Sequence, residues 1–283
     1  MAIITTNDDR KYQTANFGKT AGAVLVGGGG AYTATVAAQL PFANFCIDNM
    51  SKIGQSCDSV VINKGVDQAL ENFKLPSKGV GIIDVNANTP TNPAFDKFPK
   101  WLKSILDPMV DIKVGRNAAF DFSSNQIFVN REKLGVATFH EMGHAVNHNF
   151  SKFWKCMQGL RLPCLGLGGL LATVAVFKRK KVEGEEPNGF FDKTTTFIKN
   201  NVGKLTLATF VPIVAEELMA TYRGNKMAKK VLSPELFQKV QKTNRFGAAT
   251  YITSAIAVPL AAVVGSKVRD AIAKPKAIKV VEG

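Results

Sequence analysis

Histidine is scarce in this chain, and its cysteines lie far apart in the sequence or outside any metal-binding spacing. Only three of the 283 residues are histidine. The four cysteines, Cys46, Cys57, Cys156 and Cys164, include no Cys-x-x-Cys pair, which excludes a cysteine-ligated zinc ribbon. Because Cys164 lies in an apolar run, reduced thiols are a simpler interpretation than two disulfides.

Other functional signals are also missing. No Gly-Lys-Ser or Gly-Lys-Thr follows the run Gly27–Gly30, so it is not a P-loop, and a closely packed or flexible helix is expected there. The N-terminus lacks a basic segment followed by an apolar core, so we expect no cleavable signal peptide. Lysine and arginine outnumber the acidic residues by 36 to 22, but they are scattered and form no nucleic-acid recognition motif. The net charge of +14 therefore favours contact with anionic lipid headgroups, and we expect no nucleic-acid partner.

Two of the three histidines belong to the motif His140-Glu-Met-Gly-His144. On a helix, this spacing places both imidazoles on one face, one turn apart, where they can bind a single Zn²⁺. Glu141 then lies beside the metal and can act as general base toward a zinc-bound water. The motif predicts zinc as the cofactor and hydrolysis as the reaction.

The residues around the motif fit this interpretation. The apolar run Asn125–Asn130 follows the turn-like segment Asp121–Ser124 and is predicted to be a strand, and Arg131–Asn149 has the apolar periodicity of a helix. We expect the 125–130 strand to pair with an extended substrate. Further upstream, Val66–Phe73 is predicted to be helical.

The third metal ligand is not fixed by the motif. A third histidine six residues after His144 would indicate a metzincin, but Phe150 stands there. His148 is one further turn along the helix, and three successive turns of a straight helix do not converge on one ion, so His148 is expected beside the site or at the surface.

Two carboxylates offer an alternative third ligand. Glu216 and Glu217 follow an apolar stretch, and buried carboxylates are costly unless they are paired or bind metal. Either they ligate zinc, or they form ion pairs with Arg223, Lys226 or Lys229. Tyr222 and Arg223 are the candidates for a donor that stabilises the oxyanion.

These motifs resemble those of the integral-membrane gluzincin metalloproteases, namely the HtpX-type heat-shock proteases and the CAAX prenyl proteases. The family has HExxH, a membrane hairpin, and a helix with Glu-[Phe/Tyr]-x-Ala-Asp. Here Glu217-Leu-Met-Ala-Thr221 matches at Glu217 and Ala220 and departs at Leu218 and Thr221. The segment Gly115–Phe120 resembles the family's Asn-Ala-Phe segment. The resemblance covers about residues 110–225, and it implies Glu217 as the third ligand, with Glu216 its neighbour, and a catalytic region that faces the cytoplasm.

Three segments are candidate membrane helices. Residues 160–177 contain one charge, residues 246–265 contain none, and residues 20–45 are uncharged but rich in glycine. A span requires about 20 apolar residues, so buried core helices remain the alternative. Residues 205–215 are too short alone but can return as the second arm of a hairpin.

The expected fold is α+β and mostly helical: a zincin-like catalytic domain with an active-site helix and short strands, plus two to four membrane helices. Other predicted elements are a strand at 80–85, a loop at 86–99 and a short helix at 101–109. The predicted regions are a polar N-terminal segment (1–19), a possible membrane helix (20–45), the catalytic region (46–159), a membrane hairpin (160–215) with a charged loop (178–203), the third-ligand helix (216–245), a membrane helix (246–265) and a basic tail (266–283).

The sequence thus predicts a multi-pass, membrane-associated zinc metalloendopeptidase that acts on protein or peptide substrates. Two alternatives stay open. In one, the apolar segments form the core of a soluble zinc peptidase. In the other, a non-catalytic membrane protein retains a residual zinc site.

Overall fold

The computed structural model describes residues 4–6, 11–13, 17–90, 97, 107–181, 185–273 and 276–278, and this part of the chain is mostly helical, as predicted. It divides into two compact units. One unit comprises residues 41–160 and 212–252, and the other comprises residues 1–40, 161–211 and 253–283.

The 41–160/212–252 unit contains a small mixed sheet in the order β3-β5-β4. The central strand β5 (Gln126–Val129) pairs in parallel with β3 (Gly81–Asp84) and antiparallel with β4 (Ala118–Asp121). The predicted strands at 80–85 and 125–130 are therefore present. The turn between β4 and β5 is closed by Asp121, whose carboxylate accepts hydrogen bonds from the Ser123 backbone N–H (2.9 Å) and the Ser124 hydroxyl (2.6 Å).

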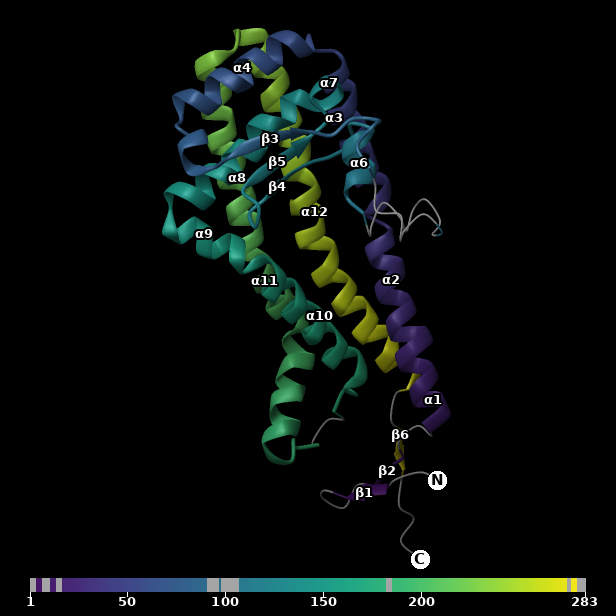
Figure 1. Cartoon of the computed structure of the whole chain (residues 1–283). Helices are drawn as coiled ribbons and strands as arrows, with labels where there is room; N and C mark the ends of the chain where they lie inside the picture. The colour runs from purple at the N-terminus through teal and green to yellow at the C-terminus, as the bar shows by residue number, and fades with distance from the viewer. Residues whose placement is uncertain are drawn as a thin grey trace, which may run out of the picture. The chain divides into compact units, whose positions relative to one another are not determined.

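The same unit contains several helices. They are α3 (Leu40–Gln55), α4 (Ser59–Asn72), α6 (Met109–Lys113), α7 (Arg131–Leu134), α8 (Thr138–Phe150) and α9 (Lys152–Gly159), with the short 3₁₀ turns Pro76–Lys78 and Gly135–Ala137. Helix α8, which carries the HEMGH motif, packs against β4 and β5 (Figure 1). Its apolar residues Phe139, Met142 and Ala145 are fully buried, together with Ile127 of β5 and Met227 of a later helix. The motif is thus anchored in the core of this unit.

Two long helices contribute residues to both units: α11 (Gly189–Val231) and α12 (Pro234–Ile272). Within the 41–160/212–252 unit, α8 and α11 touch backbone to backbone at two glycines. A Cβ atom at Gly143 would collide with the carbonyl oxygen of Ala220 and lie 2.9 Å from its Cα. A Cβ atom at Gly224 would collide with the carbonyl oxygen of Phe139. Only glycine permits so close an approach, and each helix supplies one.

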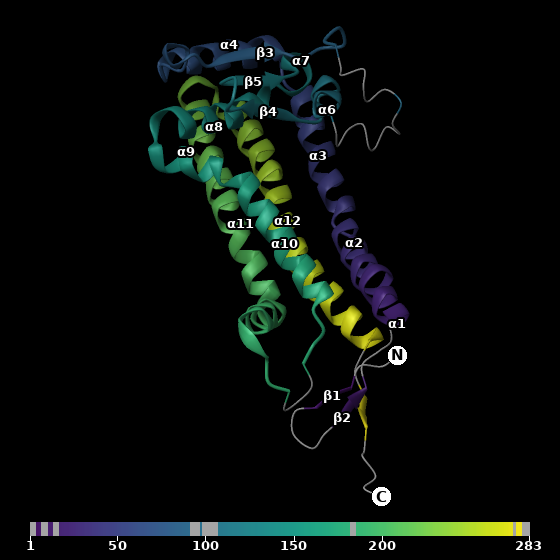
Figure 2. The same cartoon turned by 60° about the horizontal axis from the view of Figure 1, so that its bottom comes forward.

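The other unit contains α1 (Phe17–Gly22), the π-helix η1 (Ala23–Gly29), α2 (Gly30–Ala37), α10 (Arg161–Phe177), the first part of α11 and the last part of α12. Figure 2 shows α10 and the adjoining parts of α11 and α12 side by side, and they share an alanine-rich core of Ala172, Ala175, Val202 and Ala262. Gly28 is part of this packing, because a Cβ there would lie 3.3 Å from the carbonyl oxygen of Gly265. The glycine run is therefore a closely packed helix.

A buried ion pair crosses this second unit. Lys199 of α11 pairs with Asp270 of α12 at 2.9 Å, and its side chain is 4% exposed. The same ammonium group donates to the backbone carbonyl of Ala175 in α10 at 2.9 Å. One cation thus joins three helices.

Three helical stretches of the described chain are long and apolar enough to cross a membrane: Gly18–Gln55, Lys152–Phe177 and Pro234–Ile272. They contain the predicted segments 20–45, 160–177 and 246–265. These three candidate spans agree in number with the two to four membrane helices expected from the sequence. The stretch 205–215 is not a separate arm but the middle of α11.

Some predicted boundaries are wrong. The helix expected over Arg131–Asn149 is divided, because Leu134 leaves the helical region (φ −138°) and a 3₁₀ turn precedes α8. Helix α4 begins at Ser59 rather than at Val66, because Asp58 caps it by accepting hydrogen bonds from the N–H groups of the first turn. The charged loop expected over 178–203 ends where α11 begins, at Gly189.

The chain ends also differ from expectation. No strand was expected in the polar segment 1–19 or in the basic tail, but β1 (Ile4–Thr6), β2 (Lys11–Gln13) and β6 (Lys276–Ile278) form a three-stranded antiparallel sheet. The predicted helix at 101–109 lies mostly outside the described residues, and α6 begins at Met109.

Because α8 and α11 touch at Gly143, replacing this glycine by alanine should destabilise the protein, whereas the same replacement usually stabilises a helix. Gly143→Ala should destabilise the protein by about 1–3 kcal/mol, because the added methyl group forces the two backbones apart. At a helix position without such a contact, the same change stabilises by about 1 kcal/mol. Gly159→Ala is the matched control, since a Cβ there meets nothing within 4 Å. Thermal unfolding in detergent measures the stability of both variants. Equal shifts in Tm would contradict a close backbone contact at Gly143.

Candidate metal centre

Three side chains from α8 and α11 bring one donor atom each to a common point. The Nε2 atoms of His140 and His144 lie 3.0 Å apart. The Oε2 atom of Glu217 lies 3.2 Å from the first and 3.5 Å from the second. The carboxylate of Glu217 is 1% exposed, and the imidazoles are 12% and 7% exposed. A buried metal can therefore be held by His140, His144 and Glu217.

The size of this triangle fits a small tetrahedral cation. Four ligands at about 2.0–2.1 Å from a tetrahedral zinc ion lie about 3.3–3.4 Å from one another. The three observed edges, 3.0, 3.2 and 3.5 Å, bracket that value. Two imidazole lone pairs and a carboxylate at such distances repel one another unless a proton or a metal cation lies between them.

The other ring nitrogen of His144 is held by Glu216. Its Nδ1 lies 2.9 Å from Oε1 of Glu216. Because an ionised carboxylate only accepts hydrogen bonds, His144 donates its Nδ1–H, and in the neutral imidazole the Nε2 lone pair is directed at the triangle. A carboxylate behind a metal-binding histidine fixes the ring orientation and increases its basicity. Glu216 thus supports a ligand, whereas Glu217 supplies a donor atom itself.

Two amide side chains hold Glu216 in turn. Asn147 of α8 and Gln158 of α9 each donate to its Oε1 atom at 2.8 Å. Gln158 also donates to the backbone carbonyl of His144 at 3.0 Å. All three of these supporting residues, Glu216, Asn147 and Gln158, are buried. The carboxylate is therefore fixed from three sides.

His140 is supported by a hydroxyl group. The Oγ1 atom of Thr221 lies 3.3 Å from Nδ1 of His140. Thr221 is one of the two positions at which the 217–221 segment departs from the gluzincin pattern, where aspartate is usual. The hydroxyl accepts the Nδ1–H as a carboxylate would, although without its charge.

The electrostatics of the metal-free site favour a proton on His144. Burial disfavours the charged form of this imidazole, but the carboxylates of Glu217 and Glu216 outweigh that effect and hold the pKa of His144 well above its usual range. A metal ion would replace this proton as the counter-charge for the two glutamates.

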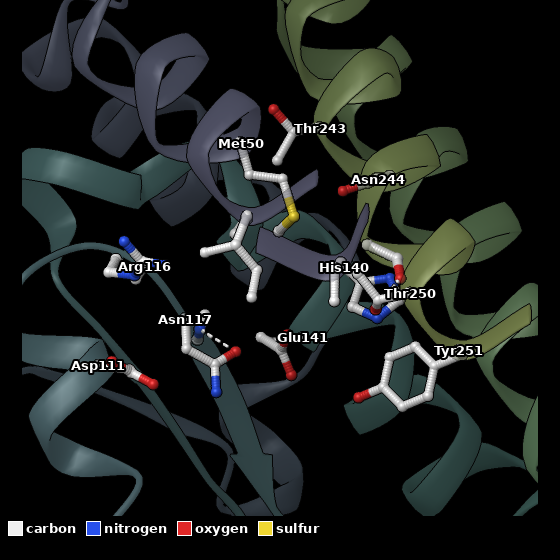
Figure 3. A pocket seen from close by; sticks show the side chains of 15 residues that line it. Met50, Asp111, Arg116, Asn117, His140, Glu141, Thr243, Asn244, Thr250 and Tyr251 are labelled. Atoms are coloured by element: carbon white, nitrogen blue, oxygen red, sulfur yellow. Dashed lines mark hydrogen bonds between the residues drawn. The ribbon is translucent and has the colours of Figure 1, made fainter. Parts of the chain in front are cut away.

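A cavity of roughly 190 Å³ opens beside the metal-binding triangle and is lined by both His140 and Glu141 (Figure 3). Residues of α3, of α12 and of the segment before β4 form its walls. Glu141 points into this cavity while remaining only 7% exposed (Figure 3). A substrate in the cavity would therefore meet a carboxylate next to the metal position.

The remaining predicted site residues lie elsewhere. His148 does not reach the triangle; its ring lies against Phe120 and Phe122, and its Nδ1 is 3.2 Å from Oε1 of Gln158. Tyr222 is 61% exposed and does not line the cavity, and neither does Arg223. The cavity wall instead presents Tyr251 of α12, which carried no motif signal in the sequence (Figure 3).

No family model, curated protein or solved structure matches this chain.

The hydrogen bonds of Gln158 predict a role in metal affinity. Gln158→Leu removes one of three donors to Glu216 and should weaken zinc binding by about 10- to 100-fold, the usual effect of losing such support. Competition with a chromophoric chelator measures the zinc Kd. Gln238→Leu is the matched control because Gln238 is exposed on α12. If both variants bind zinc like the wild type, Gln158 does not orient the ligand.

The raised pKa of His144 predicts that zinc binding weakens as the pH falls. The raised pKa favours the protonated form of His144 when no metal is bound, and a zinc ion would have to displace this proton. Zinc affinity should therefore fall by about tenfold per pH unit for each displaced proton. Zinc titrations across about pH 6 to 8 would reveal this slope. An affinity that does not change with pH would show that no proton competes at this centre.

Proposed function

We propose that this protein is a membrane-associated, zinc-dependent metalloendopeptidase of the gluzincin type. The main support for this proposal is the convergence of His140, His144 and Glu217 beside a cavity that Glu141 lines. Two imidazoles and one carboxylate, with a fourth position open, are a donor set of catalytic zinc sites. When bound, Zn²⁺ polarises a carbonyl group and lowers the pKa of a bound water to about 7.

Glu141 is the general base in this proposal. Its carboxylate is in the cavity, next in sequence to His140 and on the same helix. It takes a proton from the attacking water and returns it to the nitrogen of the leaving amine. Burial of Glu141 limits competing water around this transfer.

The substrate is an extended protein or peptide segment that adds to the edge of the sheet. The sequence-based assignment of this role to the 125–130 strand is wrong, because β5 is central and pairs on both sides. Strand β4 is the edge nearest the cavity, which Asn117 and Ala118 line (Figure 3). Within the described part of the chain no further strand pairs with the outer edge of β4, which leaves that edge for strand addition.

The membrane association rests on the three apolar helices and on the positive charge of the chain. Anionic lipids are the expected membrane partners. The cytoplasmic position of the catalytic region rests on the resemblance to the integral-membrane gluzincins alone.

Two substitutions separate metal binding from catalysis. Glu217→Ala should lose most of the zinc found in detergent-purified wild type, because only two ligands remain. Glu141→Gln should retain about one zinc per chain but hydrolyse peptides at least about 100-fold more slowly, because the amide cannot accept the proton. Elemental analysis and cleavage of an unstructured protein such as casein measure the two effects, with exposed Glu132→Gln as the control.

The outcomes distinguish the alternatives. Zinc retained in Glu217→Ala would move the third ligand to another residue. Unchanged hydrolysis in Glu141→Gln would remove the proposed base. Wild type without zinc, after preparation in zinc-containing buffer, would leave the protein without this enzymatic function.

A further inference from the structure

A groove lies between η1 and α2 on one side and α10 on the other, and it contains no residue of the metal centre. Its volume is roughly 350 Å³. The lining is mainly apolar and includes Val24 and Tyr32 on one side and Ala172, Val176 and Phe177 on the other. Both walls belong to candidate membrane spans, so we expect the chains of membrane lipids to surround this groove, named here the η1/α10 groove.

A glycine leaves the η1/α10 groove open although helix packing does not require it. Gly169 of α10 lines the groove, and a Cβ atom there would meet nothing within 4 Å. Its neighbour Gly168 differs, because a Cβ there would lie 2.8 Å from the hydroxyl oxygen of Thr209. Glycine costs a helix about 1 kcal/mol relative to alanine, and at Gly169 no close contact offsets this cost. A side chain at this position would occupy the groove.

A basic segment follows the groove directly. Phe177 is the last residue of α10, and the next four residues are Lys-Arg-Lys-Lys. Three of these cations already have acidic partners: Lys178 and Lys181 pair with Asp192, and Arg179 pairs with Glu185. Lys180 is exposed, and among the described residues no carboxylate pairs with its ammonium group. One cation at this end of the groove is therefore available to an anion.

An apolar groove that ends at a free cation matches the two parts of an anionic phospholipid. A cavity of about 150 Å³ accommodates benzene, so the groove is large enough for roughly ten carbon atoms of an acyl chain. Because other lipid tails are equally apolar, burial of the chain alone gives little preference for one lipid. A lysine near the membrane surface adds about 1 kcal/mol of attraction for an anionic headgroup. Headgroup charge should therefore determine which lipid binds.

We propose that the η1/α10 groove binds one anionic phospholipid, with an acyl chain over Gly169 and the phosphate group at Lys180. The proposal rests on the membrane association proposed above and is independent of the metal and of peptidase activity. A lipid in this position would fill the space between η1 and α10.

The test compares two lipids that share their acyl chains, dioleoyl phosphatidylglycerol and dioleoyl phosphatidylcholine. Native mass spectrometry of the full-length protein in detergent measures the Kd of the first lipid bound. Gly169→Leu fills the groove, and Lys180→Gln removes the free cation. Gly166→Leu is the matched control, because Gly166 is also an exposed glycine of α10 whose Cβ would meet nothing within 4 Å, but it does not line the groove.

Wild type and Gly166→Leu should prefer phosphatidylglycerol by about fivefold, the effect of one lysine near the headgroup. Lys180→Gln should lose this preference while it still binds phosphatidylcholine. Gly169→Leu should bind the first molecule of either lipid about five- to 100-fold more weakly, because the leucine side chain takes the place of the acyl chain. Equal lipid affinities in Gly169→Leu and Gly166→Leu overturn the proposal, as does an unchanged preference in Lys180→Gln.

Thermal unfolding separates loss of the lipid from damage to the fold. Without added lipid, Gly169→Leu should unfold at or above the Tm of wild type, because a helical glycine is replaced and nothing is displaced. Added phosphatidylglycerol should raise the Tm of wild type and of Gly166→Leu, since a ligand stabilises the state that binds it, but not that of Gly169→Leu. An equal rise in all three proteins overturns the proposal.

Failure of the underlying membrane association has a different signature. If wild type does not float with vesicles made of equal parts of the two lipids, or leaves them in alkaline carbonate, then membrane association fails, and the lipid site with it. If it stays with the vesicles but Gly169→Leu and Gly166→Leu bind lipid alike, membrane association stands and the groove is not a lipid site.

Discussion

The convergence of His140, His144 and Glu217 depends on one constraint, the contact between the backbones of α8 and α11. Gly143 meets the peptide of Ala220, and Gly224 meets the peptide of Phe139, so the two helices touch at positions close in sequence to His140, His144 and Glu217. At a usual helix separation of about 8–10 Å, side chains fill the space between the axes. Here the missing side chains let Glu217 reach both imidazoles within 3.5 Å.

The close contact between α8 and α11 also explains how the adjacent buried residues Glu216 and Glu217 are tolerated. Neighbouring residues on a helix point about 100° apart, so only one of them can face the triangle. Glu217 does so, while Glu216 turns toward Nδ1 of His144 and the amides of Asn147 and Gln158. The two carboxylates contact different ring nitrogens of His144 and otherwise have separate partners, so each buried charge is compensated.

The sequence predicted much of this arrangement but not all of it. The i, i+4 spacing of His140 and His144 requires only local helix geometry, and the apolar segments were found from composition. The choice between Glu216 and Glu217 depends on which face of α11 packs against α8, and that is a tertiary property. Tyr222 shares its exposed helix face with Leu218, which is why it lies outside the cavity. Neutral amides such as Gln158 and Asn147 belong to no motif, so only their burial and bonds reveal them.

Because this site needs glycine at two positions, the sequence pattern that identifies it includes more residues than the three candidate ligands. The pattern here is His-Glu-x-Gly-His followed by Glu-x-x-Ala-x-x-x-Gly, from Glu217 to Gly224. Chains that share the ligands but carry bulky residues at either glycine would have to separate the helices and would form a different site. The glycines therefore distinguish true counterparts of this centre from chance occurrences of the five-residue motif, and a distant relative should be recognised by its small residues as well as by its histidines.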